Sequence, residues 1–334
     1  MEIQKKLEDL MDSDATQEEA IQVLNDILKD FGYTKKDYVA ENERILNEWC
    51  NKFVEDKKDD EEYKGYKIED FFAKDGIMNI GNMFKNDNGT IWREASGKEN
   101  IKWHECPLRV LFLTKDENTD GNEAWDVRRE TFYAKRYGLP PQNKTMSGSF
   151  FYQNEACILY GLLNTKPHKM IKYNDFSWEQ ALRFPDENIF ARINCKKEVG
   201  YSTISDRVLK ESIDKYFDNL KEQILKIDAD IFVCCGHQKD DNLILNTVKD
   251  IYKDEFEYVP CVEGKGTGMH YNKKRNKLAI DAYHLAYSIP KCKGSDALED
   301  RYNETVGMYY EFLNYLKKSE KYKHIDFSAS HRQK

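Results

Sequence analysis

The sequence predicts an α/β fold of three layers, in which helices cover both faces of a central four-stranded parallel sheet. Four short apolar runs follow one another from residue 109 onward, and longer amphipathic stretches separate them. Strands that alternate with helices in this way are typical of parallel sheets. Polar residues follow each run directly, which indicates where each strand ends.

The segments before the sheet predict an acidic extension and a connecting segment. We expect residues 1–65 to be mainly helical, because apolar residues recur at helical spacing before Gly32, a residue that often ends helices. These apolar residues are Ile21, Leu24, Ile27, Leu28 and Phe31. Residues 66–106 are rich in Gly and Asn, and we expect them to connect the extension to the core and to pack on it.

The predicted α/β domain spans residues 107–316, and a basic tail, residues 317–334, follows it. The expected strands cover residues 109–113, 188–194, 230–236 and 277–284. Between the second and third strands, six apolar residues mark one helical face. They are Ile204, Val208, Ile213, Phe217, Leu220 and Ile224.

The distribution of charge bears on possible partners more than the net charge of −8 does. Residues 1–100 carry 25 acids and 15 bases, which gives −10, and residues 101–334 carry 35 acids and 37 bases, which gives +2. Basic clusters in this second part, such as Lys273, Lys274 and Arg275, are candidates for phosphate contacts. The same clusters are also typical of a solvated surface.

Several sequence features argue against a membrane, a metal or a nucleotide cofactor. No apolar run approaches the roughly 20 residues needed to cross a bilayer, so we expect a cytoplasmic protein. Eight cysteines include no CxxC pair, and Cys157, Cys234 and Cys235 lie in apolar runs, which favours reduced core thiols. The glycine-rich residues 264–268 do not match the Walker pattern, and we expect a hairpin there between strands at 258–263 and 277–283.

Polar residues at the strand ends form the candidate site. Asp116, Asn194, the Gly236-His237 pair and His284 each follow an apolar run. Ligands bind beyond the carboxyl ends of strands in open α/β sheets, so the chemistry is expected along that edge. Structural roles are the alternatives to a functional site. Asp116 also suits a helix cap or a turn, Asn194 suits a turn, and His284 suits a buried position in the core.

The four strands and their polar ends, taken in order, resemble the uracil-DNA glycosylase superfamily over roughly residues 107–316. LFLTKDEN is similar to the strand and Gly-Gln-Asp-Pro-Tyr of the first family motif, with Asp116 at the acid. FARINCKKEVG resembles the strand that ends in Asn, and IFVCCG the strand VFLLWG. AIDAYHLAYSIP resembles the strand before His-Pro-Ser-Pro, with His284 at the histidine.

The resemblance implies a role for each of these residues. Cleavage of a base–sugar bond gives an oxocarbenium-like sugar and an anionic base. Asp116 would orient water and stabilise the cation, His284 would donate to the base anion, and Asn194 would read the base edge. An extruded base would stack on Phe132, or else on Phe150 or Phe151, although all three also suit the core.

Further residues are implied in DNA contacts. Ser147 and Ser149 would meet backbone phosphates, or alternatively cap a helix. Tyr287 and Ile289 lie where the family inserts a wedge into the duplex. Lys273, Lys274 and Arg275 would add contacts to the DNA backbone.

The departures from the family motifs bear on which base is bound. Asn118 stands where the uracil-specific branch has a Tyr that excludes a 5-methyl group, so the pocket would admit a 5-substituted pyrimidine. Lys115 and Glu117 add polar groups that suit a hydroxylated or sugar-bearing substituent. Defence against viruses with modified DNA is a setting that this implies. Alternatively, another side chain such as Trp125 closes the same gap.

The expected function is therefore that of a monofunctional DNA glycosylase, a hydrolase of N-glycosyl bonds that flips and excises a base without metal or nucleotide cofactor. Three alternatives remain: a uracil-excising repair enzyme, a hydrolase of free nucleosides or nucleotides, and a nucleic-acid-binding module of the same fold without turnover. The sequence does not define the oligomeric state.

Overall fold

A computed structural model describes residues 36–85, 91–117, 123–132, 150–200, 204–238, 241–260, 268–286 and 295–323, together with Thr16, Thr119 and Phe327. Residues 38–334 form one compact unit and residues 1–37 another. The fold below is that of the larger unit. The helix expected at residues 21–31 lies outside the described residues.

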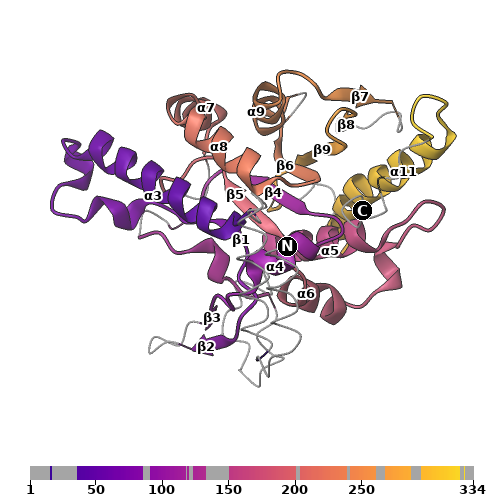
Figure 1. Ribbon diagram of the computed structural model, residues 1–334, viewed down its shortest axis with the longest axis horizontal. Helices are drawn as coiled ribbons and strands as arrows, with labels where there is room; N and C mark the ends of the chain where they lie inside the picture. Colours follow the sequence, from indigo (N-terminus) through magenta and orange to yellow (C-terminus); the bar gives the residue numbers. More distant parts are fainter. Residues whose placement is uncertain are drawn as a thin grey trace, which may run out of the picture. The chain divides into compact units, whose positions relative to one another are not determined.

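The larger unit is built on a mixed seven-stranded sheet in the order β1-β5-β4-β6-β9-β8-β7 (Figure 1). Its strands are β1 (Gly76–Ile77), β4 (Val110–Thr114), β5 (Ala191–Asn194), β6 (Ile231–His237), β7 (Glu257–Val259), β8 (Met269–Asn272) and β9 (Lys277–Tyr283). Strands β5, β4, β6 and β9 pair in parallel, whereas β1, β8 and β7 pair in antiparallel fashion. A separate hairpin joins β2 (Met83–Lys85) and β3 (Ile91–Arg93).

The helices are α3 (Tyr38–Lys57), α4 (Glu99–Glu105), α5 (Phe150–Asn164), α6 (Trp178–Glu187), α7 (Asp206–Lys215), α8 (Phe217–Ile227), α9 (Leu243–Ile251), α10 (Ser295–Tyr302) and α11 (Met308–Lys318). A π-helical turn, Asn303–Gly307, joins α10 to α11. Two apolar clusters show that helices pack on both faces of the sheet. One contains Leu111 and Leu113 with residues of α3, α8 and α9. The other contains Val110 and Phe112 with residues of α5 and α11.

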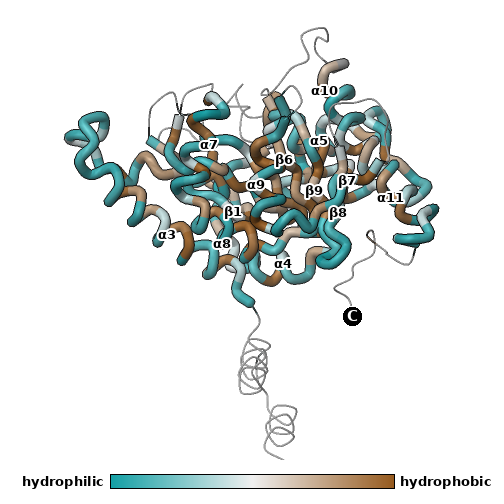
Figure 2. The backbone as a smooth tube through the Cα atoms, turned by 90° about the horizontal axis from the view of Figure 1, so that it is seen from above, coloured by the Kyte–Doolittle hydropathy of each residue, from teal (hydrophilic) through white to brown (hydrophobic). Residues whose placement is uncertain are grey.

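The α/β class is confirmed, but the sheet has three more strands than the four that the sequence predicted. The four apolar runs form the four adjacent parallel strands, which are buried along almost all of their length. Figure 2 shows hydrophobic residues along β6. The additional strands are short, and β8 has the sequence MHYN, whose polar residues are buried. Such a strand lacks the apolar run by which the others were found. The hairpin expected between strands at 258–263 and 277–283 is wrong, because β7 pairs with β8, which lies between β7 and β9. Residues 261–267 lie outside the described part.

One expectation about helices differs from the structure. The apolar face at residues 204–224 belongs to two helices, α7 and α8, with a break at Tyr216, and Val208 is 38% exposed. Helix α3 lies within the mainly helical extension expected at residues 1–65. It packs in the same core as the sheet, because Leu46, Trp49 and Phe53 are buried in the first apolar cluster.

Other expectations concern the thiols and the tail. The six cysteines within the described ranges are free, and five of them are buried, including Cys157, Cys234 and Cys235. Cys261 and Cys292 lie outside those ranges. Two residues of the basic tail, Tyr322 and Phe327, belong to the core, because they are buried in the second apolar cluster.

A buried ion pair fixes the carboxyl end of β5. The Lys197 ammonium lies 2.7 and 2.5 Å from the two Asp75 carboxylate oxygens, and these side chains are at most 1% exposed. Asp75 also accepts hydrogen bonds from the Asn194 main-chain N–H at 2.8 Å and from the Gln223 amide at 2.9 Å. The pair therefore connects the segment before β1 to β5 and α8.

Lys197→Met should lower the free energy of unfolding by about 3–5 kcal/mol, because it leaves the Asp75 carboxylate buried without its cation. Urea unfolding measures this loss. Lys210→Met is the matched control, since Lys210 forms an exposed ion pair with Asp214 on α7 and its loss should have no measurable effect. Equal effects of the two substitutions would contradict the role of the buried pair.

Candidate functional site

The carboxyl ends of β5, β4, β6 and β9 lie along one edge of the sheet because these strands are parallel. Thr114 at the end of β4 pairs with Asn194 at the end of β5, and His284 directly follows β9. The chain runs from β4 to β5 on one side and then to β6 on the other, so a topological switch point lies beside β4. Ligands in open α/β sheets bind at such points.

Asp116 lies two residues beyond β4 and is partly buried. Its carboxylate fits against Gly200, where an added Cβ would come within 2.3 Å of Asp116 Oδ2. Burial raises the pKa of Asp116 to about 6, and the nearby Lys196 and Lys115 offset part of that rise. No helix begins at Asp116, since the next described helical turn starts at Val127 and is capped by Asp126. The helix-cap alternative for Asp116 is therefore wrong.

Two buried lysines accompany Asp116. Lys115 donates to Asp206 Oδ1 at 2.9 Å, and the Lys196 ammonium donates to the carbonyl oxygens of Glu198 and Val199. Burial lowers the pKa of Lys196. Lys196 was not among the predicted site residues, although its place two residues after a buried strand indicates this edge.

His284 is held as a neutral hydrogen-bond donor. Burial, together with the positive charge of Lys115, lowers its pKa to about 4. His284 Nδ1 accepts a hydrogen bond from the Ala286 main-chain N–H at 3.3 Å. In the neutral imidazole the proton is therefore on Nε2, which is the nitrogen that can donate to a ligand. A role as a buried core residue would explain the burial of His284 but not its electrostatic interaction with Lys115.

The three candidate stacking residues occupy different environments. Phe132 is 2% exposed and packs edge-on against Tyr152 and Phe190, with centroids 5.5 and 5.9 Å away, so it belongs to the core. Phe150 begins α5 and is partly buried. Phe151 lies next to the candidate site, with its ring 5.9 Å from the His284 ring. The structure therefore favours Phe151 over Phe132.

Asn194 is buried at the end of β5, and its side chain is bound to β4. Asn194 Oδ1 accepts a hydrogen bond from Thr114 Oγ1 at 2.5 Å. An amide oxygen has two lone pairs, so Oδ1 can accept a second hydrogen bond from a ligand. Asn194 is fixed in a strand and does not belong to a turn.

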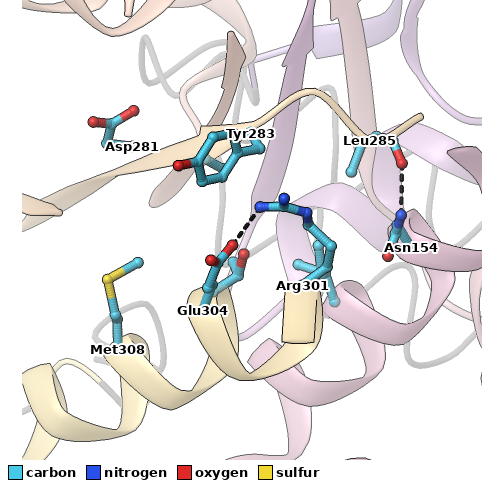
Figure 3. Close-up of a pocket in the computed structure, with 10 residues that line it drawn as sticks. Asn154, Asp281, Tyr283, Leu285, Arg301, Glu304 and Met308 are labelled. Carbon is cyan, nitrogen blue, oxygen red and sulfur yellow. Dashed lines mark hydrogen bonds and ion pairs between the residues drawn. The ribbon is translucent and has the colours of Figure 1, made fainter. Parts of the chain in front are cut away.

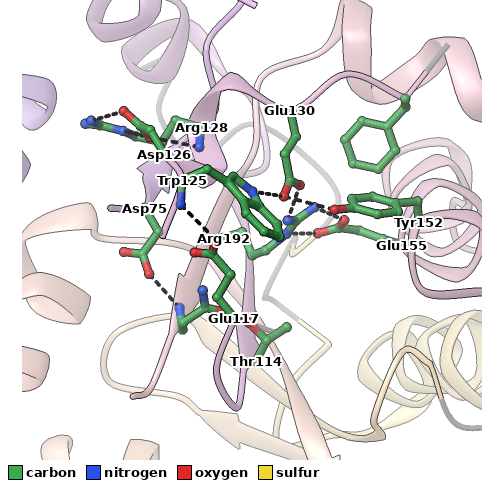
Figure 4. Close-up of polar contacts among 12 residues, drawn as sticks. Asp75, Thr114, Glu117, Trp125, Asp126, Arg128, Glu130, Tyr152, Glu155 and Arg192 are labelled. Carbon is green, nitrogen blue, oxygen red and sulfur yellow. Dashed lines mark hydrogen bonds and ion pairs between the residues drawn. The ribbon is translucent and has the colours of Figure 1, made fainter. Parts of the chain in front are cut away.

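A buried network of charges underlies this edge (Figure 4). Arg192 binds the carboxylates of both Glu130 and Glu155. Glu130 also accepts hydrogen bonds from Tyr152 at 2.9 Å and from the Trp125 indole at 2.8 Å. The Arg192 guanidinium lies 5.1 Å from the Phe151 ring centroid. The network therefore sets the position of α5 relative to β5. Its members are far apart in the sequence, and they were not among the predicted site residues.

Lys273, Lys274 and Arg275 do not lie at this edge. They occupy the turn between β8 and β9, at the amino end of β9, whereas His284 follows the carboxyl end. Lys274 and Arg275 bind Glu255 at 2.9 and 3.2 Å. A seven-residue strand separates them from His284, a span of about 20 Å. Asn118, Ser147, Ser149, Tyr287 and Ile289 lie outside the described residues.

Two hollows lie away from Asp116. The small pocket in Figure 3 lies between the end of β9 and the α10–α11 helix, with Tyr283 and Arg301 in its wall. Beside it, His237 Nδ1 lies 3.0 Å from an Asp281 oxygen. A hollow of about 800 Å³ lies at the amino ends of β4 and β5, lined by Leu108 and Ile189 among others. Its size does not make it the candidate active site, because the polar strand ends are at the opposite edge.

Comparisons with known proteins do not identify a relative of this chain. No family model matches the chain, and neither a curated protein nor a solved structure matches it. Within the described ranges, no group of three or more His, Cys, Asp or Glu could hold a metal ion. The helices in those ranges include none that is long and apolar enough to cross a membrane. The resemblance therefore rests on the motifs and their order.

Gly200→Ala should displace the Asp116 carboxylate, because the new Cβ would lie 2.3 Å from Oδ2. We expect the carboxylate to move toward solvent and its pKa to fall from about 6 toward its ordinary value, as measured by carbon-13 NMR. Gly307→Ala is the control, since its nearest neighbour would be Met170 Cε at 3.7 Å. An unchanged Asp116 pKa in Gly200→Ala would show that the contact does not hold the carboxylate.

Proposed function

We propose that this protein is a DNA glycosylase that hydrolyses the N-glycosidic bond of a flipped base. The observation that carries the proposal is that Asp116 after β4 and neutral His284 after β9 lie at the same edge of the sheet and both interact electrostatically with Lys115. A carboxylate and a neutral donor are the two groups that this bond cleavage requires. Phe151 beside His284 supplies a ring on which a base can stack.

The reaction follows from the chemistry of these groups. As the bond to the base breaks, positive charge develops on the sugar and negative charge on the base. The Asp116 carboxylate stabilises the sugar cation and orients the attacking water. His284 Nε2–H donates a hydrogen bond to an oxygen of the departing base, and Asn194 holds the base edge through its amide. These steps use only side chains of this chain.

The substrate in this proposal is a 5-substituted pyrimidine in DNA, and uracil is the alternative. Asn118, on which the wider pocket depends, is outside the described residues. The Trp125 indole is held by Glu130, so its position is fixed by the buried network. We also propose that β5, β4, β6 and β9 correspond to the four-stranded parallel sheet of the glycosylase fold, and that the other three strands of the sheet are additions to that fold. Defence against modified viral DNA in the cytoplasm is the proposed setting.

The proposal is tested by offering the same modified pyrimidine in duplex DNA, in single-stranded DNA and as a free nucleoside, and measuring the released base. Release from DNA alone is expected. Release from the free nucleoside alone would identify a nucleoside hydrolase instead. Binding of DNA without release from any substrate would identify a binding module.

Asp116→Asn should reduce base release by at least ~100-fold, because it removes the charge that stabilises the sugar cation. Since the carboxylate must be ionised, the wild-type rate should fall as the pH drops below about 6, the pKa of Asp116. Initial rates across this pH range provide the measurement.

The control for this experiment is a variant with Gln at positions 273, 274 and 275, at the opposite edge of the sheet. Its rate of base release should equal that of the wild-type chain. An Asp116→Asn protein that is folded and fully active would remove Asp116 from the mechanism.

A further inference from the structure

Glu117 is a buried carboxyl group with one unpartnered oxygen. Its Oε1 accepts a hydrogen bond from the Trp125 main-chain N–H at 3.0 Å. Its Oε2 is buried and has no hydrogen-bond partner within the described part of the chain. The residue is 5% exposed, and its carbonyl oxygen is bound to the Gly200 N–H at 2.9 Å. A buried polar atom without a partner is costly, so Oε2 requires an explanation.

The surroundings of Glu117 favour its protonated form. Burial raises its pKa to about 9, although the hydrogen bond from the Trp125 main-chain N–H lowers it; the carboxylates of Glu130 and Asp75 add to the rise, and Arg192 offsets part of it. Arg192 is already bound to two other carboxylates, and Lys197 is bound to Asp75. Near neutral pH the group is therefore a carboxylic acid, whose O–H donates a hydrogen bond.

Glu117 lies on the same side of the sheet as the proposed base-binding residues. Alternate residues of a strand point to the same face, so Thr114 and Asn194 share the α5 face with Phe112 and Arg192. Their mutual hydrogen bond agrees with this. Glu117 is linked to that face through Trp125, whose main-chain N–H donates to Glu117 and whose indole donates to Glu130. It interacts electrostatically with Arg192 and Glu130 of that face and also with Asp75.

The other proposed contacts to the base also lie on the α5 face. Ile280 and Ala282 of β9 point to it, and His284 continues their alternation to the Phe151 ring. Asn194, Phe151 and His284 therefore lie on one face of the sheet, and Glu117 follows Asp116 at the carboxyl end of β4 on the same edge.

We propose that Glu117 keeps its proton and donates its Oε2–H hydrogen bond to an exocyclic carbonyl oxygen of the extruded base. This inference rests on the proposed function and adds a second donor beside His284. The proton stays on Glu117, and the hydrogen bond strengthens as negative charge develops on the oxygen. A buried acid that stays neutral in order to donate to an oxyanion is an established catalytic device.

The position of the donor also predicts which pyrimidine is preferred. A uracil-type ring has two carbonyl oxygens, so His284 and Glu117 can each bind one. A cytosine-type ring presents an amino group in place of one oxygen, and two donors would then face each other. The site should therefore favour 5-substituted uracils over 5-substituted cytosines.

The experiment measures kcat for release of 5-hydroxymethyluracil and 5-hydroxymethylcytosine from duplex DNA across pH. The wild-type chain should prefer the uracil type, and kcat should fall as pH rises through about 9. Glu117→Gln keeps a donor that does not titrate, so it should retain activity within about tenfold and lose the alkaline fall. Glu117→Leu should lose ~100-fold or more in kcat.

Glu99→Gln is the matched control, because Glu99 is a buried carboxylate, 4% exposed, that caps a loop outside the site. It should keep the alkaline fall. An alkaline fall that persists in Glu117→Gln, or a Glu117→Leu protein as active as the wild-type chain, would overturn the inference.

A second measurement needs no substrate. Because the folded pKa of Glu117 is raised, its ionisation opposes folding, and the wild-type Tm should fall relative to that of Glu117→Gln as pH rises toward about 9. A constant difference in Tm would show that the carboxyl group is ionised throughout, against the inference.

Failure of the proposed function is separable from failure of this inference. If the wild-type chain releases no base from any duplex, the glycosylase proposal fails. Calorimetric binding of free 5-hydroxymethyluracil then tests Glu117 directly. Affinity at least about tenfold weaker in Glu117→Leu supports the hydrogen bond, as expected for a lost buried donor, and equal affinity overturns it.

Discussion

Parallel backbone pairing of β5, β4, β6 and β9 is the constraint on which the candidate site depends. It aligns the carboxyl ends of four strands along one edge. The pairing continues past the strands, since Cys195 donates to the Thr114 carbonyl and Lys196 to the Lys115 carbonyl, both at 2.9 Å. The segments that carry the polar side chains are therefore held by main-chain hydrogen bonds. Residues that are far apart in the chain therefore lie at the same edge of the sheet.

Burial then gives neighbouring ionisable groups different protonation states. Burial raises the pKa of Asp116 to about 6 and that of Glu117 to about 9. Nearby lysines offset part of the rise at Asp116, whereas nearby carboxylates add to the rise at Glu117. The pKa of His284 falls to about 4. Near neutral pH, one carboxyl group is an anion, its neighbour is a donor, and the imidazole is a second donor. Environments that separate the pKa values of adjacent groups are typical of acid–base sites.

The sequence predicted the parallel core and part of the site, because both depend on short local patterns. Apolar runs marked the four buried strands, and polar residues after them marked Asp116, Asn194 and His284. Strand β8 was missed because its buried residues are polar. Phe132 was the first choice for stacking but lies in the second apolar cluster, because sequence spacing cannot distinguish a core ring from a ring next to His284. The distance of Lys273, Lys274 and Arg275 from the edge depends on strand direction. The acidic surroundings of Glu117 come from residues 75, 130 and 192, which only tertiary packing brings together.

We expect the edge that holds Asp116 and His284 to release a base from DNA. Mass spectrometry of the free bases that the purified chain releases from unmodified DNA and from DNA with 5-substituted pyrimidines tests this claim most directly. The account predicts a free 5-substituted pyrimidine from the modified DNA alone, with an abasic sugar left in the strand. Release of uracil alone would place the chain with ordinary repair enzymes, and release of no base from any DNA would contradict the account.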